Sequence, residues 1–174
     1  MTMITTMIMT IWIDKMKREI LFLLLLCALC ACSSSSDDKA KDMTMPQITA
    51  QGILPEPDNC QAYFLGDTIR FHYIFTDDKE LGAFNIEVHN NFDHHSHSTS
   101  AEDCFMEPKK QPVRPWVKNK DYAIPDRLRS FEASFDIPIP ADVDPGDYHF
   151  MIRLTDKAGW QQLKAGSIKL VQRE

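Results

Sequence analysis

Strict alternation of apolar and polar residues constrains this chain more than any other feature. In the run DTIRFHYIF, which begins at Asp67, every second residue is apolar and large, and the run AFNIEVHN, which begins at Ala83, repeats the pattern. A period of two places the apolar side chains on one face of a β-strand. The same pattern recurs in SFEASF, DYHFMIRLTD and LKAGSIKLV, and MPQITAQGI is expected to open the fold. We therefore predict strands throughout the chain after Pro46.

The segments between these runs carry turn chemistry. They include LPEPDN, TDDKELG, ADVDPGD and DKAG, which are rich in Pro, Gly and Asp. No segment after Cys32 has a convincing helical period. Residues 46–174 are enough for one domain with a single core. The prediction is an all-β fold, an immunoglobulin-like antiparallel β-sandwich over residues 46–174.

The first 32 residues have the composition of an export signal. Lys17 and Arg18 precede an apolar run that ends at Leu29, and small residues follow. The sequence LCAC resembles a bacterial lipobox, in which a cysteine after a small residue is lipidated and becomes the new N-terminus; here that cysteine is Cys32. An ordinary signal peptide with spare cysteines is the alternative. We interpret residues 1–15 as a mis-called or vector-derived extension, 16–31 as a lipoprotein signal peptide, and 32–45 as the lipidated cysteine with a flexible linker.

Charge and anchor together indicate where the protein acts. Without residues 1–31 the chain would carry a net charge of about −7, which argues against nucleic acid as a partner and against docking of the folded domain on anionic lipid headgroups. Acyl chains on Cys32 would provide the membrane attachment. The acidic pair in SSSSDDKAKD resembles the surface-export signal of Bacteroidetes lipoproteins. We expect a lipid-anchored, surface-exposed protein of the outer membrane, with a periplasm-facing orientation as the alternative.

A family resemblance covers most of this region. From GDTIRFHYIFTDDKELGAFNIEVHNNFDHHSH through GDYHFMIRLTDKAGW, the chain resembles the Bacteroidetes lipoprotein family catalogued as domain of unknown function 4625. The resemblance implies an immunoglobulin-like fold and a lipoprotein address. It implies no biochemical activity.

Two cysteines remain beyond the lipobox, Cys60 and Cys104. In an exported protein, such a pair most simply forms a disulfide. That bond would tie the segment before the first core strand to the far end of a histidine-rich loop. Two free thiols joining a metal site are the alternative.

The stretch HNNFDHHSHSTSAEDC, from His89 to Cys104, holds four of the six histidines. If AFNIEVH and DYHFMIRL pair antiparallel as strands C and F, His89 and His149 point outward on the same face. In an extended loop, Asp93, His95 and His97 would fall on one side. Imidazole-rich coordination suits zinc or copper better than calcium or magnesium. We predict a transition-metal site without an organic cofactor, formed by His89, Asp93, His95, His97 and His149.

Other roles, which do not involve a transition metal, remain open for these and other polar or aromatic residues. Outward histidines on a sheet are commonly just solvated, and Asp142, Asp144 and Asp147 could pair with protonated imidazoles. A second acidic group, Asp77, Asp78 and Asp156, is expected at the opposite end of the sandwich, where it could hold calcium or simply form turns. Trp116 and Trp160 could be exposed platforms for a sugar or peptide, or packing residues.

The sequence carries no nucleophile elbow, phosphate loop or paired-carboxylate cleft. We therefore expect no enzyme. The predicted function is a non-catalytic cell-surface lipoprotein that binds a transition metal through a histidine cluster. The alternative is a surface interaction module that recognises a glycan, a protein or an outer-membrane receptor, with incidental histidines.

Overall fold

The computed structural model describes residues 41–96 and 104–173. This part of the chain contains eight strands. Within these ranges there is no helix, and accordingly none that could cross a membrane. The predictions for residues 1–15, 16–31, Cys32 and His97 lie outside the described residues. The strands are β1 (Gln47–Thr49), β2 (Gln61–Phe64), β3 (Thr68–Thr76), β4 (Leu81–Asn90), β5 (Lys118–Ala123), β6 (Ser130–Pro138), β7 (Gly146–Asp156) and β8 (Gln161–Val171).

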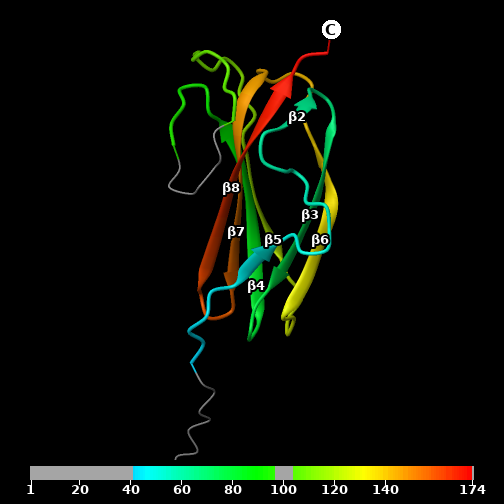
Figure 1. Cartoon of the computed structure of the whole chain (residues 1–174), viewed down its shortest axis with the longest axis vertical. Helices are drawn as coiled ribbons and strands as arrows, with labels where there is room; N and C mark the ends of the chain where they lie inside the picture. Colours follow the sequence, from blue (N-terminus) through cyan, green and yellow to red (C-terminus); the bar gives the residue numbers. More distant parts are fainter. Residues whose placement is uncertain (1–40, 97–103, 174) are drawn as a thin grey trace, which may run out of the picture. The chain divides into compact units, whose positions relative to one another are not determined.

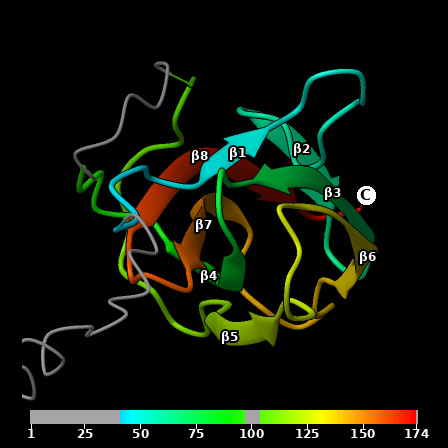
Figure 2. The ribbon, with the colours of Figure 1, turned by 90° about the horizontal axis from the view of Figure 1, so that it is seen from below.

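The strands form two sheets, with the orders β1-β3-β6 and β2-β8-β7-β4-β5 (Figure 1). Within the larger sheet, β7 pairs antiparallel with both β4 and β8, while β2 runs parallel to β8 at one edge. In the view from below, β3 and β6 lie on one side of the core, and β7 and β4 on another (Figure 2). This order is that of an immunoglobulin sandwich whose C-F-G sheet carries a C′ strand, here β5. The predicted all-β sandwich is confirmed.

The core consists of the apolar faces that alternation predicted. On β3 the buried residues are spaced two apart, and β4 repeats this spacing from Phe84 to Val88, whereas β7 is buried at every residue from Gly146 to Ile152. Aromatic rings meet at its centre, with Phe71 and Phe84 stacked at 6.1 Å and Phe71 and Phe135 tilted at 4.9 Å between ring centroids. The members of the hydrophobic core cluster on these three strands are Ile69, Phe71, Tyr73, Phe75, Leu81, Phe84, Ile86, Val88, Tyr148, Phe150, Ile152 and Leu154.

A tyrosine corner lies at the start of β7, where Tyr148 is hydrogen-bonded to the turn before the strand. The Tyr148 hydroxyl donates to the carbonyl of Asp144 at 2.6 Å, the arrangement found before strand F in Greek-key sandwiches. The same hydroxyl accepts from the backbone N–H of Trp116 at 3.2 Å. Burial raises the pKa of Tyr148 to about 12. Because Trp116 is only 6% exposed, it packs in the core and is not a ligand platform.

The Cys60–Cys104 disulfide is present, with 5.5 Å between the two Cα atoms. It joins the residue before β2 to the far side of the histidine loop, as predicted. The N–H of Cys60 donates to the carbonyl of Ser167 on β8 at 2.8 Å, so the bond fixes the loop to the edge of the larger sheet.

Candidate metal centre

The β4–β7 ladder places two imidazoles side by side. His89 and His149 are Cα partners in this antiparallel pairing, which confirms the register predicted from the sequence. Each lies one residue out of phase with the buried Val88 and Phe150, so both side chains leave the core on the outer face of the sheet. Their ring centroids are 5.4 Å apart.

A turn after β4 brings in a third imidazole. Phe92 is buried and meets Tyr148 edge to face at 5.3 Å, which anchors the start of the loop. The N–H of His94 then donates to the carbonyl of Asn91, and His94 has a left-handed φ of 60°. The chain therefore reverses and lays His95 over the strands. The predicted extended path of this stretch is wrong, because the turn directs the loop.

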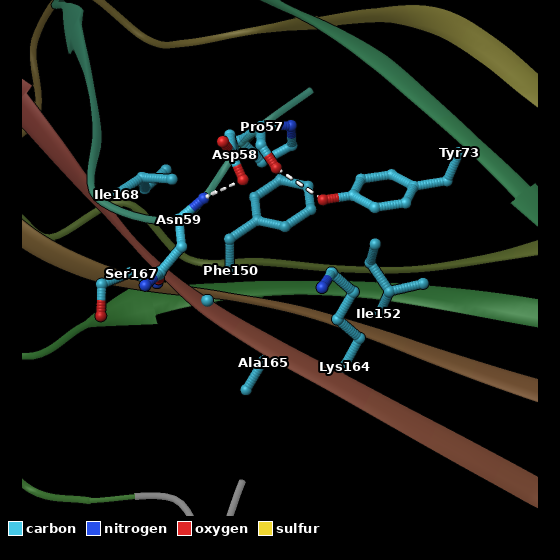
Figure 3. A pocket seen from close by; sticks show the side chains of 11 residues that line it. Pro57, Asp58, Asn59, Tyr73, Phe150, Ile152, Lys164, Ala165, Ser167 and Ile168 are labelled. Atoms are coloured by element: carbon cyan, nitrogen blue, oxygen red, sulfur yellow. Dashed lines mark hydrogen bonds between the residues drawn. The ribbon is translucent and has the colours of Figure 1, made fainter. Parts of the chain in front are cut away.

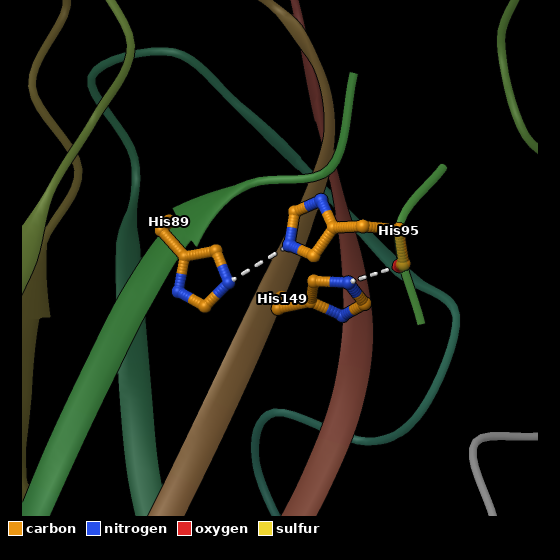
Figure 4. Close-up of side chains that lie close together, drawn as sticks. All are labelled: His89, His95 and His149. Carbon is orange, nitrogen blue, oxygen red and sulfur yellow. Dashed lines mark hydrogen bonds between the residues drawn. The ribbon is translucent and has the colours of Figure 1, made fainter. Parts of the chain in front are cut away.

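Three rings consequently gather on one patch of the sheet (Figure 4). The ring of His95 stacks on that of His89 at 5.4 Å and stands edge-on to that of His149 at 5.0 Å between centroids. One nitrogen from each ring lies within 4.8 Å of the other two. The two closest, Nε2 of His89 and Nε2 of His95, are 3.3 Å apart.

Carboxylates stand behind two of the rings. The Nδ1–H of His95 donates to Oδ1 of Asp93 at 2.5 Å, and this hydrogen bond lowers the pKa of the Asp93 carboxyl. Oε1 of Glu87 lies 3.1 Å from Nδ1 of His89. A carboxylate at Nδ1 favours the tautomer whose proton is on Nδ1, which leaves the Nε2 lone pair for a metal. Asp93 thus orients the His95 ring, whereas the contact of Glu87 with His89 is an ion-pair distance without hydrogen-bond geometry.

The separation of the two Nε2 atoms is compatible with a shared metal ion. The two Nε2 atoms lie 3.3 Å apart, a distance at which one ring can donate a hydrogen bond to the other when no ion is bound. Two nitrogens bound tetrahedrally to zinc, each at about 2.05 Å, are about 3.3 Å apart. The observed separation therefore equals that of two ligands on one zinc ion.

The third ring lies deeper than the others. His149 is 5% exposed, whereas the side chain of His95 is 36% exposed. Nε2 of His149 lies 3.1 Å from the backbone carbonyl of His95, which holds the loop against β7. The cluster is therefore closed by the sheet below and opens toward solvent on the His95 side.

Other polar groups near the cluster have separate contacts. Nε2 of His94 lies 2.8 Å from the carbonyl of Glu107, on the other side of the loop. His72, on the opposite sheet, pairs with Glu132 at 2.8 Å. The three aspartates considered as imidazole partners contact other groups: Asp142 pairs with Arg114, Asp144 accepts from the N–H groups of Val113 and Arg114, and Asp147 accepts from the N–H of Glu107.

A second group of oxygen ligands lies at the other end of the β4–β7 ladder. Asp77 and Asp156 come together there, as predicted, but the third member is Asp42 and not Asp78. Trp160, close by, donates its indole N–H to the carbonyl of Asp42 at 3.0 Å and is 37% exposed.

Comparison with known proteins identifies the family of this sandwich. The family described as "domain of unknown function (DUF4625)" matches residues 30–171. The chain belongs to this family. The DUF4625 description assigns no activity, and no curated protein matches the chain.

A solved structure with a partly similar fold is that of Spo0M, a sporulation control protein from Bacillus subtilis. It is 10% identical, has a TM-score of 0.39, and the match covers 75% of this chain and 49% of that chain. The chain thus spans about half the length of that protein.

Proposed function

We propose that this domain binds one transition-metal ion, zinc or copper, through His89, His95 and His149. The observation that supports this most is the convergence of the three rings, with one nitrogen of each within 4.8 Å of the other two and with Asp93 hydrogen-bonded to Nδ1 of His95. Carboxylate–histidine–metal arrays of this kind are typical of zinc sites. A ligand set of imidazoles suits zinc and copper and disfavours calcium and magnesium.

Three protein ligands leave one position of a tetrahedral ion open. His97, two residues beyond His95, is the protein's own candidate for it, and water or a partner's side chain is the other. Because the site opens toward solvent beside His95, an ion could be exchanged there. We therefore propose metal capture, as an accessory to uptake or sequestration, and not catalysis.

Metal content tests the proposal directly. The protein from Ser33 to Glu174 contains the whole compact unit Asp42–Glu174 and can be purified without a histidine tag. Zinc and copper are then measured by elemental mass spectrometry, and zinc binding is titrated by calorimetry. We expect one ion per chain, and loss of binding in His89→Ala/His149→Ala.

A matched control separates the site from general histidine binding. His72→Ala/Glu132→Ala removes an imidazole and its carboxylate partner on the other sheet, away from the loop that carries His95. This variant should bind zinc as the unaltered protein does. Absence of stoichiometric metal, or equal binding by both double variants, would contradict the proposal.

The cellular location of the protein is part of the same proposal. The lipobox-like LCAC and the linker that follows support lipid attachment at Cys32 and display on the outer membrane. Expression of the whole chain, with Cys32→Ser as the control, tests this. The unaltered protein should partition with membranes and carry an acylated N-terminal cysteine, and the variant should do neither.

A surface interaction module is the second candidate, and one hollow favours it. Beside the disulfide, a concavity of about 410 Å³ is lined by Phe105, Met106 and Lys169 among others, and Phe105 is 85% exposed. Small-ligand sites commonly have this volume. Under this reading, His89→Ala/His149→Ala would leave glycan or protein binding unchanged.

A second, smaller hollow, lined by Asn59, Tyr73 and Phe150 among others, does not offer an alternative ligand site. There, Tyr73 donates its hydroxyl to the Pro57 carbonyl at 2.6 Å, and Asn59 donates its N–H to Oδ1 of Asp58 (Figure 3). The remaining cavity is about 30 Å³, which has room for water only.

A further inference from the structure

Three carboxylates converge at the end of the sandwich farthest from the histidines. The β4–β7 ladder runs from the His89–His149 pair to the Leu81–Asp156 pair, seven residues along β7 and therefore roughly 23 Å away. At that end, one oxygen each of Asp42, Asp77 and Asp156 lies within 4.8 Å of the other two.

The three aspartates come from separate parts of the chain. Asp42 precedes β1, Asp77 follows β3, and Asp156 is the last residue of β7. Gly82 permits the close approach of β4 to this corner, because a Cβ there would lie 2.8 Å from the carbonyl oxygens of Thr155 and Asp156. The convergence is thus a consequence of the fold and not of one acidic turn.

Local hydrogen bonds occupy one carboxylate oxygen of Asp77 and one of Asp156. Oδ1 of Asp77 accepts from the N–H groups of Lys79 and Glu80, both at 2.8 Å. Oδ1 of Asp156 accepts from the N–H of Trp160 at 2.8 Å. These bonds account for the turn-forming role of both residues.

The second oxygens have no such role. The Oδ2 atoms of Asp77 and Asp156 are buried and have no hydrogen-bond partner. Asp156 is also buried as a whole residue, with 4% of its surface exposed. A buried carboxylate oxygen without a donor is strongly disfavoured unless a cation compensates it. Two nearby cations are engaged elsewhere, since Lys157 pairs with Asp126 and Arg129 donates to the carbonyl of Lys79.

We propose that Asp42, Asp77 and Asp156 form a calcium site. Oxygen ligands with a concentrated negative charge suit a hard cation, and calcium tolerates the irregular geometry of side chains from three segments better than magnesium does. The site is separate from the histidine cluster and does not depend on metal binding there.

Calcium at this site has a structural consequence. Asp42 belongs to the segment that leads into β1, and its carbonyl already accepts from the Trp160 indole. An ion shared with Asp77 and Asp156 fastens that segment to the end of the sandwich. The segment from Lys41 to β1 is therefore held more firmly when calcium is present.

Calorimetric titration with calcium chloride tests the site. After treatment with a chelator, the protein from Ser33 to Glu174 should bind one calcium ion, with a dissociation constant on the order of 0.1–1 mM, typical of extracellular modules. Asp156→Asn and Asp42→Asn should each weaken binding at least tenfold. Asparagine keeps the Oδ1 acceptor that the turn needs and removes the charge.

Adjacent residues supply the matched control. Asp78 is the sequence neighbour of Asp77 but does not belong to the cluster. Asp78→Asn should therefore leave calcium binding unchanged. His89→Ala/His149→Ala should also bind calcium normally, which distinguishes the two sites. If Asp156→Asn does not fold, Asp42→Asn, altered outside the strands, still decides the question.

Protection from proteolysis reports the fastening of the segment. Cleavage after Lys41 by a lysine-specific protease should slow in millimolar calcium in the unaltered protein and in Asp78→Asn, but not in Asp42→Asn. No calcium binding, tighter binding of magnesium than of calcium, or binding that is equal in Asp42→Asn and Asp78→Asn would overturn the proposal.

Discussion

His89 on β4 and His149 on β7 are direct partners in an antiparallel ladder, with ring centroids 5.4 Å apart on the outer face of the sheet. Strand pairing holds their backbones in place, so these two rings are already adjacent before any ion binds. Only His95, which arrives on a loop, must be ordered independently. The loop is itself anchored, by Phe92 at one end and by the Cys60–Cys104 disulfide at the other.

Replacing the carboxylate behind His95 should weaken metal binding without removing a ligand. Asp93 is exposed and accepts from Nδ1 of His95, so Asp93→Asn loses the orientation and the added basicity but little folding stability. We expect zinc affinity to fall about 10- to 100-fold. Glu132→Gln is the control, because it alters a carboxylate–histidine pair on the other sheet. Equal zinc affinity for Asp93→Asn and the unaltered protein would show that Asp93 does not support the site.

Zinc should stabilise the fold in proportion to its binding. At a free concentration 100 times its dissociation constant, a ligand specific for the folded state contributes about 2.7 kcal/mol. The thermal midpoint of the unaltered protein should therefore rise with zinc, and that of His89→Ala/His149→Ala should stay constant. A scan monitored by circular dichroism measures this. A rise of the same size in both proteins would point to binding elsewhere.

Removing the disulfide should affect both stability and site. Cys60→Ala/Cys104→Ala opens a loop whose ends are 44 residues apart in sequence, a loss of about 4 kcal/mol in the chain-entropy description. Urea unfolding gives the free energy, and zinc titration of the folded variant should show weaker binding because the loop that carries His95 has lost one anchor. Unchanged zinc affinity would mean that Phe92 and the turn at His94 suffice to hold it.

The tyrosine corner should be a stability element independent of metal. Tyr148→Phe leaves the Asp144 carbonyl and the Trp116 N–H without their partner, at a cost of about 1–3 kcal/mol. Tyr63→Phe, whose hydroxyl makes only a 3.4 Å contact with Glu56, should cost less in the same urea measurement. Zinc binding should persist in both variants. Equal free energies of unfolding for the two variants would contradict the role of the corner.

Alternation in the sequence predicted the core strands because their apolar residues form one buried face, and this holds on β7 too, although the residues between them are also buried as far as Ile152. The pattern failed for β2 and β5, which lie at the edges of the larger sheet. In KNKDYA, the sequence of β5, only partial burial occurs at two positions, so no apolar period is present to detect. Edge strands of this kind form through backbone pairing with a neighbour, which residue type does not reveal.

The two strand histidines of the site were predictable because side-chain period and strand pairing together fix a register. His95 was placed in the site for the wrong geometric reason, since a left-handed residue at His94 reverses the loop. Glu87 was missed, although it lies two residues before His89 and hence on the same face. Asp42 was missed because a linker residue has no period that relates it to Asp77 and Asp156.

The Glu107–Lys169 pair should make stability depend on pH at both extremes. The hydrogen bond from Lys169 lowers the pKa of Glu107, so this contribution is present above the unfolded-state pKa and is lost as pH falls through the folded-state pKa. Burial alone would lower the pKa of Lys169, but Glu107 and Asp147 raise it overall, so that contribution is present below the unfolded-state value and is lost as pH rises through the folded-state value. The pair therefore stabilises the fold between about pH 5 and pH 10.

The difference in free energy of unfolding between the unaltered protein and Glu107→Gln should be constant from about pH 6 to 9 and shrink in acid. A difference at pH 3 as large as that at pH 7 would show that the charge of Glu107 is not what stabilises this corner.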